Sequence, residues 1–139
     1  MRVKSFEDLQ VWQDAREFVK SIYEIASLNN FKKDYGLKDQ IQRAAVSIMN
    51  NISEGYERDN NKEFMNFLGY AKGSAGEVRS MLRAALDLNY ISKKEFDKNY
   101  SASVSIITQI SNFKKYLRNY TIKENIKNIK SAISLILKI

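Results

Sequence analysis

Apolar residues recur at intervals of three and four along most of the chain, which is the spacing of an amphipathic helix. The first run of this kind contains Val11, Trp12, Ala15, Phe18, Val19, Ile22 and Ala26. Ser5 lies three residues before Asp8, a helix-start pattern that places an acidic side chain near the positive end of the helix dipole. We therefore predict a first helix that starts after Ser5 and ends near the polar stretch at residues 27–36.

Two more amphipathic runs follow. The second run contains Leu37, Ile41, Ala44, Ala45, Ile48 and Ile52. We expect Gly55 to cap the C-terminus of that helix, because glycine is common just past a helix end. The third run extends from about residue 61 to residue 88 and contains Phe64, Phe67, Leu68, Ala71, Ala75, Val78, Leu82 and Ala85. The short polar stretch between the two runs predicts that these helices are antiparallel neighbours.

A capping box, Ser92 with Glu95, predicts the start of a fourth helix. The apolar positions of that helix are Phe96, Tyr100, Val104, Ile107, Ile110, Phe113 and Leu117. No segment alternates between apolar and polar residues for long enough to predict a strand. The fold class expected is all-α, an up-down-up-down four-helix bundle over residues 1–120 with a basic C-terminal helical extension.

Residues 121–139 form the expected extension, an amphipathic basic C-terminal helix or tail. Its apolar positions follow one another at four and three: Ile122, Ile126, Ile129, Ile133 and Ile136. Lys123, Lys127 and Lys130 lie off this row. A short helix with one apolar row is not stable alone in water, so we expect it to pack on the bundle or on a neighbouring copy. An anionic membrane surface is the alternative.

The positive charge of the chain is concentrated in its last third. The chain has 23 basic and 16 acidic residues, a net charge of +7. Residues 98–139 contain eight basic residues and one acidic residue, Glu124, so 8 − 1 = +7 and this segment carries the whole excess. Such an asymmetry indicates nucleic acid or another anionic surface as a partner, unless it is an ordinary solvated lysine-rich face.

Two groups of basic residues are the candidate nucleic-acid contacts. Lys114, Lys115 and Arg118 cluster near the end of the fourth helix, beside Tyr116 and Tyr120, which could stack on bases. The second group shares one face of the third helix and consists of Lys72, Arg79 and Arg83. It is either a ridge that contacts phosphates or a solvated face.

The composition argues against most kinds of catalysis. The chain contains no cysteine and no histidine, which removes thiol chemistry, Cys-His and Ser-His catalysis and the usual zinc sites. A magnesium-dependent carboxylate enzyme is weakened but stays open. We expect no catalytic residue, no metal and no cofactor. The lack of cysteine fits a cytoplasmic protein, no apolar run predicts a membrane span, and residues 1–10 lack the apolar region of a secretory signal.

The stretch GYAKGSAGEVRS, residues 69–80, contains three of the five glycines. A phosphate-binding loop would need a strand before it and a free helix N-terminus after it. Here helical periodicity continues on both sides, so Gly69, Gly73 and Gly76 are predicted to lie inside a helix. We expect them to form a close-packing face against another helix of this chain or of another subunit, the alternative being a merely tolerated weak helix.

Polar residues recur on facing sides of the second and third helices. They are Arg43, Ser47, Asn51 and Glu54 on the second helix and Ser74 and Glu77 on the third. Because buried polar groups must find partners, these residues predict a structural polar network in which Arg43 pairs with Glu54 or Glu77. A carboxylate site at Glu54 and Glu77 is the functional alternative.

Three segments carry a resemblance to a known family. They are SFEDLQVWQDA at residues 5–15, LKDQIQRAAVSIMNNISEGYER at 37–58 and FMNFLGYAKGSAGEV at 64–78. The positions that fit the pattern are Phe6, Leu9, Val11, Trp12, Ala15, Gln40, Ile41, Arg43, Ala44, Ser47, Ile48, Asn51, Ile52, Ser53, Glu54, Gly55, Arg58, Phe64, Phe67, Leu68, Ala71, Gly73, Ser74 and Glu77. With this pattern the chain resembles the four-helix-bundle family of 23S rRNA-intervening sequence proteins.

The resemblance implies a homo-oligomer, with a pentamer as the expected size. The chain is also similar to the accessory protein of diversity-generating retroelements, a pentameric basic barrel that works with RNA and a reverse transcriptase. The hypothesis is therefore a non-catalytic oligomeric scaffold that binds nucleic acid, most simply RNA, through its basic surface. The alternative is a structural oligomer that binds only a protein partner.

Overall fold

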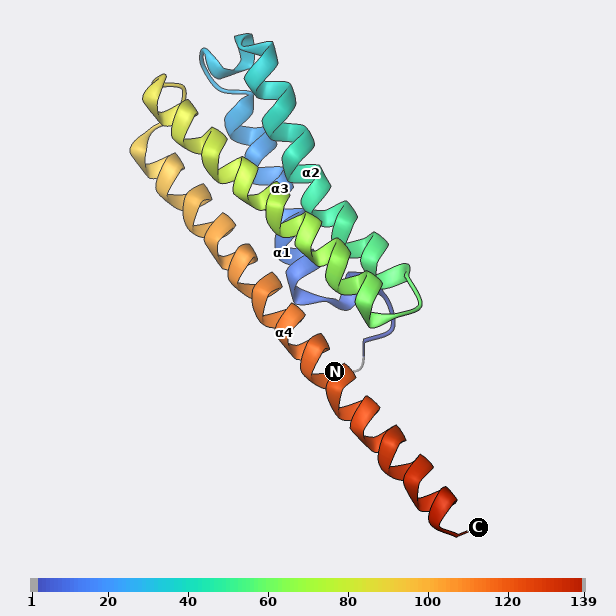
Figure 1. Cartoon of the computed structure of the whole chain (residues 1–139). Coiled ribbons are helices and arrows are strands. Elements are labelled where there is room, and N and C mark those ends of the chain that lie inside the picture. The colour runs from blue at the N-terminus through green and yellow to red at the C-terminus, as the bar shows by residue number, and fades with distance from the viewer. Residues whose placement is uncertain (1–2, 139) are drawn as a thin grey trace.

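A computed structural model describes residues 3–138 of the chain (Figure 1). Its helices are α1 (Gln10–Ala26), α2 (Tyr35–Glu57), α3 (Asn61–Asp87) and α4 (Lys93–Leu137), with 3-10 turns η1 (Phe6–Asp8) and η2 (Phe31–Lys33). Successive helices run in opposite directions, and residues 3–138 contain no strand. The predicted all-α four-helix bundle is confirmed.

The four helices pack around one apolar core. α1 and α3 lie diagonally, and each packs between α2 and α4. Fully buried aliphatic side chains come from every helix: Ile22, Ile41, Ile48, Ile52, Leu68, Val78, Leu82, Ile106 and Ile110. Each such side chain contributes roughly 1.5–3 kcal/mol relative to an exposed one, so the period-3.6 pattern translates directly into the core of the bundle.

The N-terminus differs from the predicted helix start. The Asp8 carboxylate accepts the backbone N–H of Ser5 at 3.2 Å and that of Lys4 at 2.8 Å. The turn closed in this way is the 3-10 turn η1, and Leu9 then takes an extended conformation before α1 begins at Gln10. Ser5 and Asp8 therefore organise a separate turn that precedes the helix.

The prediction that Gly55 caps α2 is wrong. α2 continues to Glu57, and Gly55 is buried inside it. A Cβ atom at this position would lie 2.7 Å from the Cβ of Phe67 and 3.3 Å from the carbonyl oxygen of Phe64. Glycine is present here because α3 approaches the backbone of α2 too closely for any side chain.

α4 is one uninterrupted helix of 45 residues, so the predicted C-terminal extension is its continuation. The Asn61 side chain at the start of α3 donates a hydrogen bond to Thr121 Oγ1 at 3.2 Å, where α4 leaves the bundle. Residues 122–137, called the arm below, project beyond the other helices (Figure 1). At 1.5 Å per residue these 16 residues add about 24 Å to the molecule.

The close approach at Gly55 makes its replacement a direct test of the packing of α2 on α3. We expect Gly55→Ala to lower the free energy of unfolding, because overpacking costs about 1–3 kcal/mol and exceeds the roughly 0.5–1 kcal/mol that alanine gains in a helix. Urea unfolding followed by circular dichroism measures the difference.

Gly36→Ala is the matched control, since a Cβ atom there would meet nothing closer than Asp34 Oδ1 at 3.7 Å. This variant should be as stable as the wild type or more stable. Equal stability of both variants would mean that α2 and α3 are not in the close contact described.

Candidate nucleic-acid interface

Lys114, Lys115 and Arg118 occupy the last two turns of α4 within the bundle. Lys114 is half-buried and leans across α3, with its ammonium nitrogen 3.2 Å from where a Cβ atom on Gly69 would be. Lys115 and Arg118 are exposed. Within the first candidate group, Lys114 therefore contacts α3, whereas Lys115 and Arg118 face solvent shortly before the arm begins.

No carboxylate neutralises this group within the described residues. The ion pairs of residues 3–138 lie elsewhere, and they join Arg43 to Asp39, Arg58 to Glu54 and Lys93 to Asp97. Exposed cations without a bound carboxylate keep their full attraction for an anion. The charge of the group is thus available to a ligand.

The second candidate group divides into two parts. Lys72 is exposed, whereas Arg79 and Arg83 lie over aromatic rings of α4. Arg79 donates a hydrogen bond of 2.7 Å to the Tyr100 hydroxyl, and its guanidinium carbon and that of Arg83 are each 4.9 Å from the Tyr100 ring centre. Stacking of this kind fixes α3 against α4, so these two arginines have a structural role in addition to any contact with a ligand.

Helix geometry groups the tyrosines differently from the sequence. Tyr116 and Tyr120 are exposed, and their ring centres are 6.4 Å apart. Lys123 and Lys127 follow them at the four-three-four spacing of a single helix face. Sequence proximity associated the tyrosines with Lys114, but Lys114 turns toward α3. The spacing along α4 was the signal that could have identified this aromatic and cationic face.

The three glycines of α3 are open to solvent or nearly so. A Cβ atom added at Gly73 or Gly76 would meet no atom of another element within 4 Å among the described residues. A Cβ atom at Gly69 would meet the Lys114 side chain alone. The expected close packing against another helix of the same chain is therefore wrong. Close packing against another subunit stays a prediction.

A polar network does connect α2 to α3. The hydroxyl oxygens of Ser47 and Ser74 are 2.9 Å apart, and the Asn51 amide donates to Ser47 Oγ at 2.9 Å and to the Ser47 carbonyl at 2.8 Å. These residues are half-buried, so each hydrogen bond takes the place of a hydrogen bond to water that the packed helices prevent.

Arg43, Glu54 and Glu77 lie outside this network, which corrects the expected ion pair. Arg43 is exposed and bonds to Asp39 one turn earlier at 2.9 Å, and Glu54 bonds to Arg58 one turn later at 3.1 Å. Glu77 is exposed on α3. Arg43 and Glu54 thus pair one turn away on their own helix at the solvent-exposed surface, which costs less than burying a charge in a packed interface.

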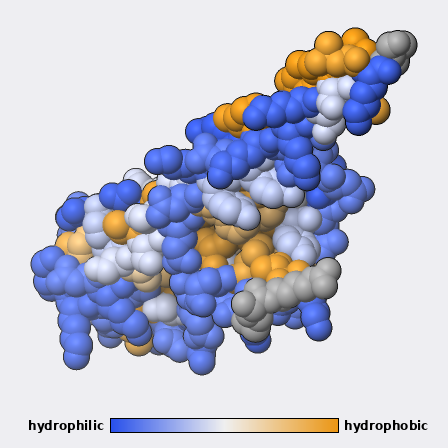
Figure 2. Space-filling view, turned by 90° about the horizontal axis from the view of Figure 1, so that it is seen from below, coloured by the Kyte–Doolittle hydropathy of each residue, from blue (hydrophilic) through white to orange (hydrophobic). Residues whose placement is uncertain are grey.

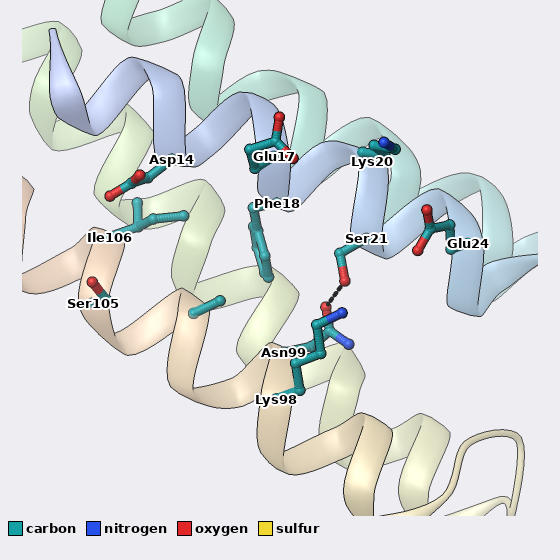
Figure 3. Close-up of a pocket in the computed structure, with 11 residues that line it drawn as sticks. Asp14, Glu17, Phe18, Lys20, Ser21, Glu24, Lys98, Asn99, Ser105 and Ile106 are labelled. Carbon is teal, nitrogen blue, oxygen red and sulfur yellow. Dashed lines mark hydrogen bonds between the residues drawn. The ribbon is translucent and has the colours of Figure 1, made fainter.

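The structure also contains a groove between α1 and α4, with a volume of about 440 Å³ (Figure 3). At its base the Ser21 hydroxyl donates to Asn99 Oδ1 at 2.6 Å, and the Asn99 amide donates to the Glu95 carbonyl at 2.9 Å. The buried polar groups of this groove therefore satisfy one another. Neither in this groove nor in the rest of residues 3–138 do three acidic side chains gather where they could hold a metal ion.

The two interpretations of the polar residues differ in their coupling energies. In double-mutant cycles by urea unfolding, Ser47→Ala and Ser74→Ala should couple by about 0.5–1.5 kcal/mol, the usual net contribution of a hydrogen bond. Arg43→Ala and Glu54→Ala should show no coupling, because the two side chains do not meet. Coupling in the Arg43 cycle would restore the ion pair expected from the sequence.

Tyr100 and Tyr90 should titrate on opposite sides of the ordinary tyrosine value of 10.0. The hydrogen bond from Arg79, with Arg83 acting in the same direction, lowers the pKa of Tyr100. The hydrogen bond that the Tyr90 hydroxyl donates to Asp34 Oδ2 raises the pKa of Tyr90. Phenolate absorbance of wild type minus Tyr100→Phe should therefore rise below pH 10, and wild type minus Tyr90→Phe above it.

The same two pKa shifts determine how the free energy of unfolding changes with pH. The Tyr100 contribution to the free energy of unfolding is present above pH 10 and is lost as the pH falls through its lowered pKa. The Tyr90 contribution is present below pH 10 and is lost as the pH rises through its raised pKa. Two difference titrations with the same midpoint would contradict the hydrogen bonds described.

Comparison with known proteins places the chain in a family. Within residues 3–138, the helices lack an apolar stretch of the length that a membrane span requires, and no curated protein matches the sequence. The 1.70 Å crystal structure of a protein of unknown function from the S23 ribosomal protein family of Bacteroides thetaiotaomicron VPI-5482 is similar, with a TM-score of 0.70 and 25% identity over 76% of this chain and 98% of that chain. The model of the 23S rRNA-intervening sequence protein family matches residues 7–112, from the first turn to within α4. This chain belongs to the 23S rRNA-intervening sequence protein family.

Proposed function

We propose that the protein is a non-catalytic oligomeric scaffold that binds RNA through the basic surface of α4. The observation that supports this proposal is the placement of charge. Residues 98–139 contain the entire net charge of +7, and almost all of them belong to one helix, α4, whose basic side chains in this segment are exposed except for the half-buried Lys114. A cationic rod of this kind offers a polyanion many contacts with little dependence on sequence.

The basic residues of α4 extend along the helix. From Lys114 to Lys138 the helix rises about 36 Å at 1.5 Å per residue, and it contains one acidic residue, Glu124, over that length. The ion pairs of residues 3–138 leave the α4 residues in this range unneutralised. Nucleic acid would therefore contact both the end of the bundle and the arm.

The aromatic residues favour an unpaired strand over a duplex. Tyr116 and Tyr120 present exposed rings on the same face as Lys123 and Lys127. Stacking of bases on aromatic side chains next to cations is a common mode of single-strand binding, and it tolerates many sequences. This supports single-stranded RNA with weak sequence preference as the ligand.

Self-association is part of the proposal. A ring of five chains, the size implied by the family resemblance, would repeat the Lys114, Lys115 and Arg118 group five times and sum its field. The open face of α3 at Gly73 and Gly76 supports this, because another subunit can approach there without meeting a side chain. The proposal includes a cytoplasmic location, in keeping with the lack of cysteine.

Charge reversal tests the binding surface. We expect the combined change Lys114→Glu, Lys115→Glu and Arg118→Glu to abolish binding of single-stranded RNA at moderate salt. The reason is the loss of up to three phosphate contacts, which would lower the slope of log affinity against log salt by about 2, at roughly 0.7 per phosphate on single strands. Fluorescence polarisation at several salt concentrations measures both quantities.

The matched control reverses three lysines at the opposite end of the bundle, Lys32→Glu, Lys33→Glu and Lys94→Glu. Both triple variants change the net charge by six units, from +7 to +1, and they differ in position, since Lys32 and Lys33 lie in η2 and Lys94 lies in the first turn of α4. The control should bind RNA more tightly than the α4 variant, and light scattering should show that both assemble like the wild type. An equal loss of RNA binding in both variants would mean that binding depends on the net charge of the protein and not on this surface. No binding by the wild type at low salt would favour a scaffold that binds only protein.

A further inference from the structure

The arm carries a row of isoleucines that the rest of residues 3–138 leaves about half or more exposed. Ile122, Ile126, Ile129, Ile133 and Ile136 are between 48% and 67% exposed. Figure 2 shows hydrophobic side chains along the projecting arm, next to hydrophilic ones. An exposed apolar row on a protruding helix costs solubility unless another surface covers it.

The row begins where α4 leaves the bundle, and it lies on a different side of the helix from the core residues. The last buried core residue of α4 is Leu117, and the row starts five residues later at Ile122. Five residues correspond to about 140° around a helix, at roughly 100° per residue. The isoleucines therefore do not extend the core of the bundle, and they need a partner outside the chain.

We propose that the arms of several copies of this chain pack together as a parallel coiled coil through these isoleucines. The proposal rests on the oligomer of the proposed function and assigns a part of its interface. The four-three-four-three spacing is that of positions d and a of a heptad, with Ile126 and Ile133 at a and Ile122, Ile129 and Ile136 at d. The match to the family model covers residues 7–112 and so does not include this segment.

The width of the row favours a coiled coil over a lipid surface. Over residues 122–131 the isoleucines are the sole apolar residues of the arm, two positions in seven, which is the narrow seam of a coiled coil. A helix that lies on a membrane has a wider apolar face along its whole length, rich in aromatic residues and leucine. Leu135 and Leu137 add exposed apolar surface off the seam in the last turns of the arm. Residues 121–139 contain no aromatic residue. The isoleucine seam thus has the shape of a helix partner.

The charges beside the seam select parallel arms. In a parallel arrangement Lys130 at position e faces Asn125 at g of the neighbour, and Leu137 at e faces Ala132 at g. In an antiparallel arrangement e positions face each other, which would bring Lys123 of one arm against Lys130 of the next. The two positively charged lysines would repel each other, so the antiparallel alternative is disfavoured.

The composition of the seam also bears on the number of strands. Isoleucine at both a and d shifts coiled coils from two strands to three or more. A ring of three or more bundles with cyclic symmetry would point all of its arms in the same direction, so that they run parallel. The seam is little more than two heptads long, too short to hold alone, so it depends on the bundles to keep the arms close together.

Disulfide crosslinking of the full chain tests the arrangement, because the sequence contains no cysteine of its own. In parallel arms, Ile136→Cys places a thiol against the same thiol of the neighbour, so mild oxidation should give a disulfide-linked dimer on non-reducing gels. Ser134→Cys is the matched control two residues away, at position b outside the seam, and should crosslink far less. A mixture of Ile122→Cys and Ile133→Cys chains would form the mixed dimer in preference only if the arms were antiparallel, because an antiparallel pairing that sets Lys123 against Lys130 also sets Ile122 at d opposite Ile133 at a.

Seam variants separate the arm from the rest of the interface. Adding Ile126→Ser and Ile133→Ser to the Ile136→Cys chain should abolish its crosslinking, whereas adding Asn128→Ser and the exposed, off-seam Leu135→Ser should leave it unchanged. An Ile136→Cys chain that stays reduced, or that crosslinks no better than the Ser134→Cys chain, overturns the proposal. Flotation of that reduced chain with phosphatidylserine vesicles would then assign the seam to a membrane.

These outcomes are independent of RNA binding. Crosslinked arms in a chain that binds no RNA would support the coiled coil and contradict the proposed function. RNA binding by an oligomer whose arms do not crosslink would support the proposed function and contradict the coiled coil. A wild-type chain that light scattering shows to be monomeric, together with an Ile136→Cys chain that stays reduced, would overturn the coiled coil and the oligomer together.

Discussion

The continuity of α4 is the constraint on which the rest of the structure depends. The chain has no proline, and residues 93–137 contain no glycine, so nothing in this segment interrupts the hydrogen-bond ladder of the helix. One rigid element therefore lies between α1 and α3, presents the basic surface and continues into the arm. Because the three parts share one helix, the direction of the arm and the position of each cation are set by how α4 packs in the bundle.

The packing of α2 on α3 provides the platform against which α4 is fixed. At Gly55 the two helices approach so closely that a Cβ atom would overlap Phe67. Two turns away, Ser47 and Ser74 join the same helices through a hydrogen bond. Gly55 leaves no space for a side chain, and the Ser47–Ser74 hydrogen bond has directional geometry. Together these two contacts define one register between α2 and α3, which apolar burial alone would define less strictly.

Contacts of arginine with aromatic residues complete the connection from α3 to α4. Arg79 and Arg83 stack on Tyr100, and the same interaction shifts the titration of that tyrosine. Two of the cations that the sequence presented as a ridge are thus partly used for packing. The exposed basic residues that take no part in this packing lie further along α4, at Lys115 and Arg118, and continue along the arm.

The sequence alone determined the helices, their order and the core, because a period of 3.6 residues identifies which face of each helix avoids water, as the buried series from Phe64 to Ala85 on α3 illustrates. It also located the excess charge, because charge is a property of composition. Tertiary structure alone decided which polar groups meet. Arg43 bonds to Asp39 and not to Glu54, Gly55 is a contact point and not a cap, and Lys114 turns to α3 away from Tyr116. Each of these outcomes depends on distances between helices of a few ångströms, and periodicity along a single helix carries no information about them.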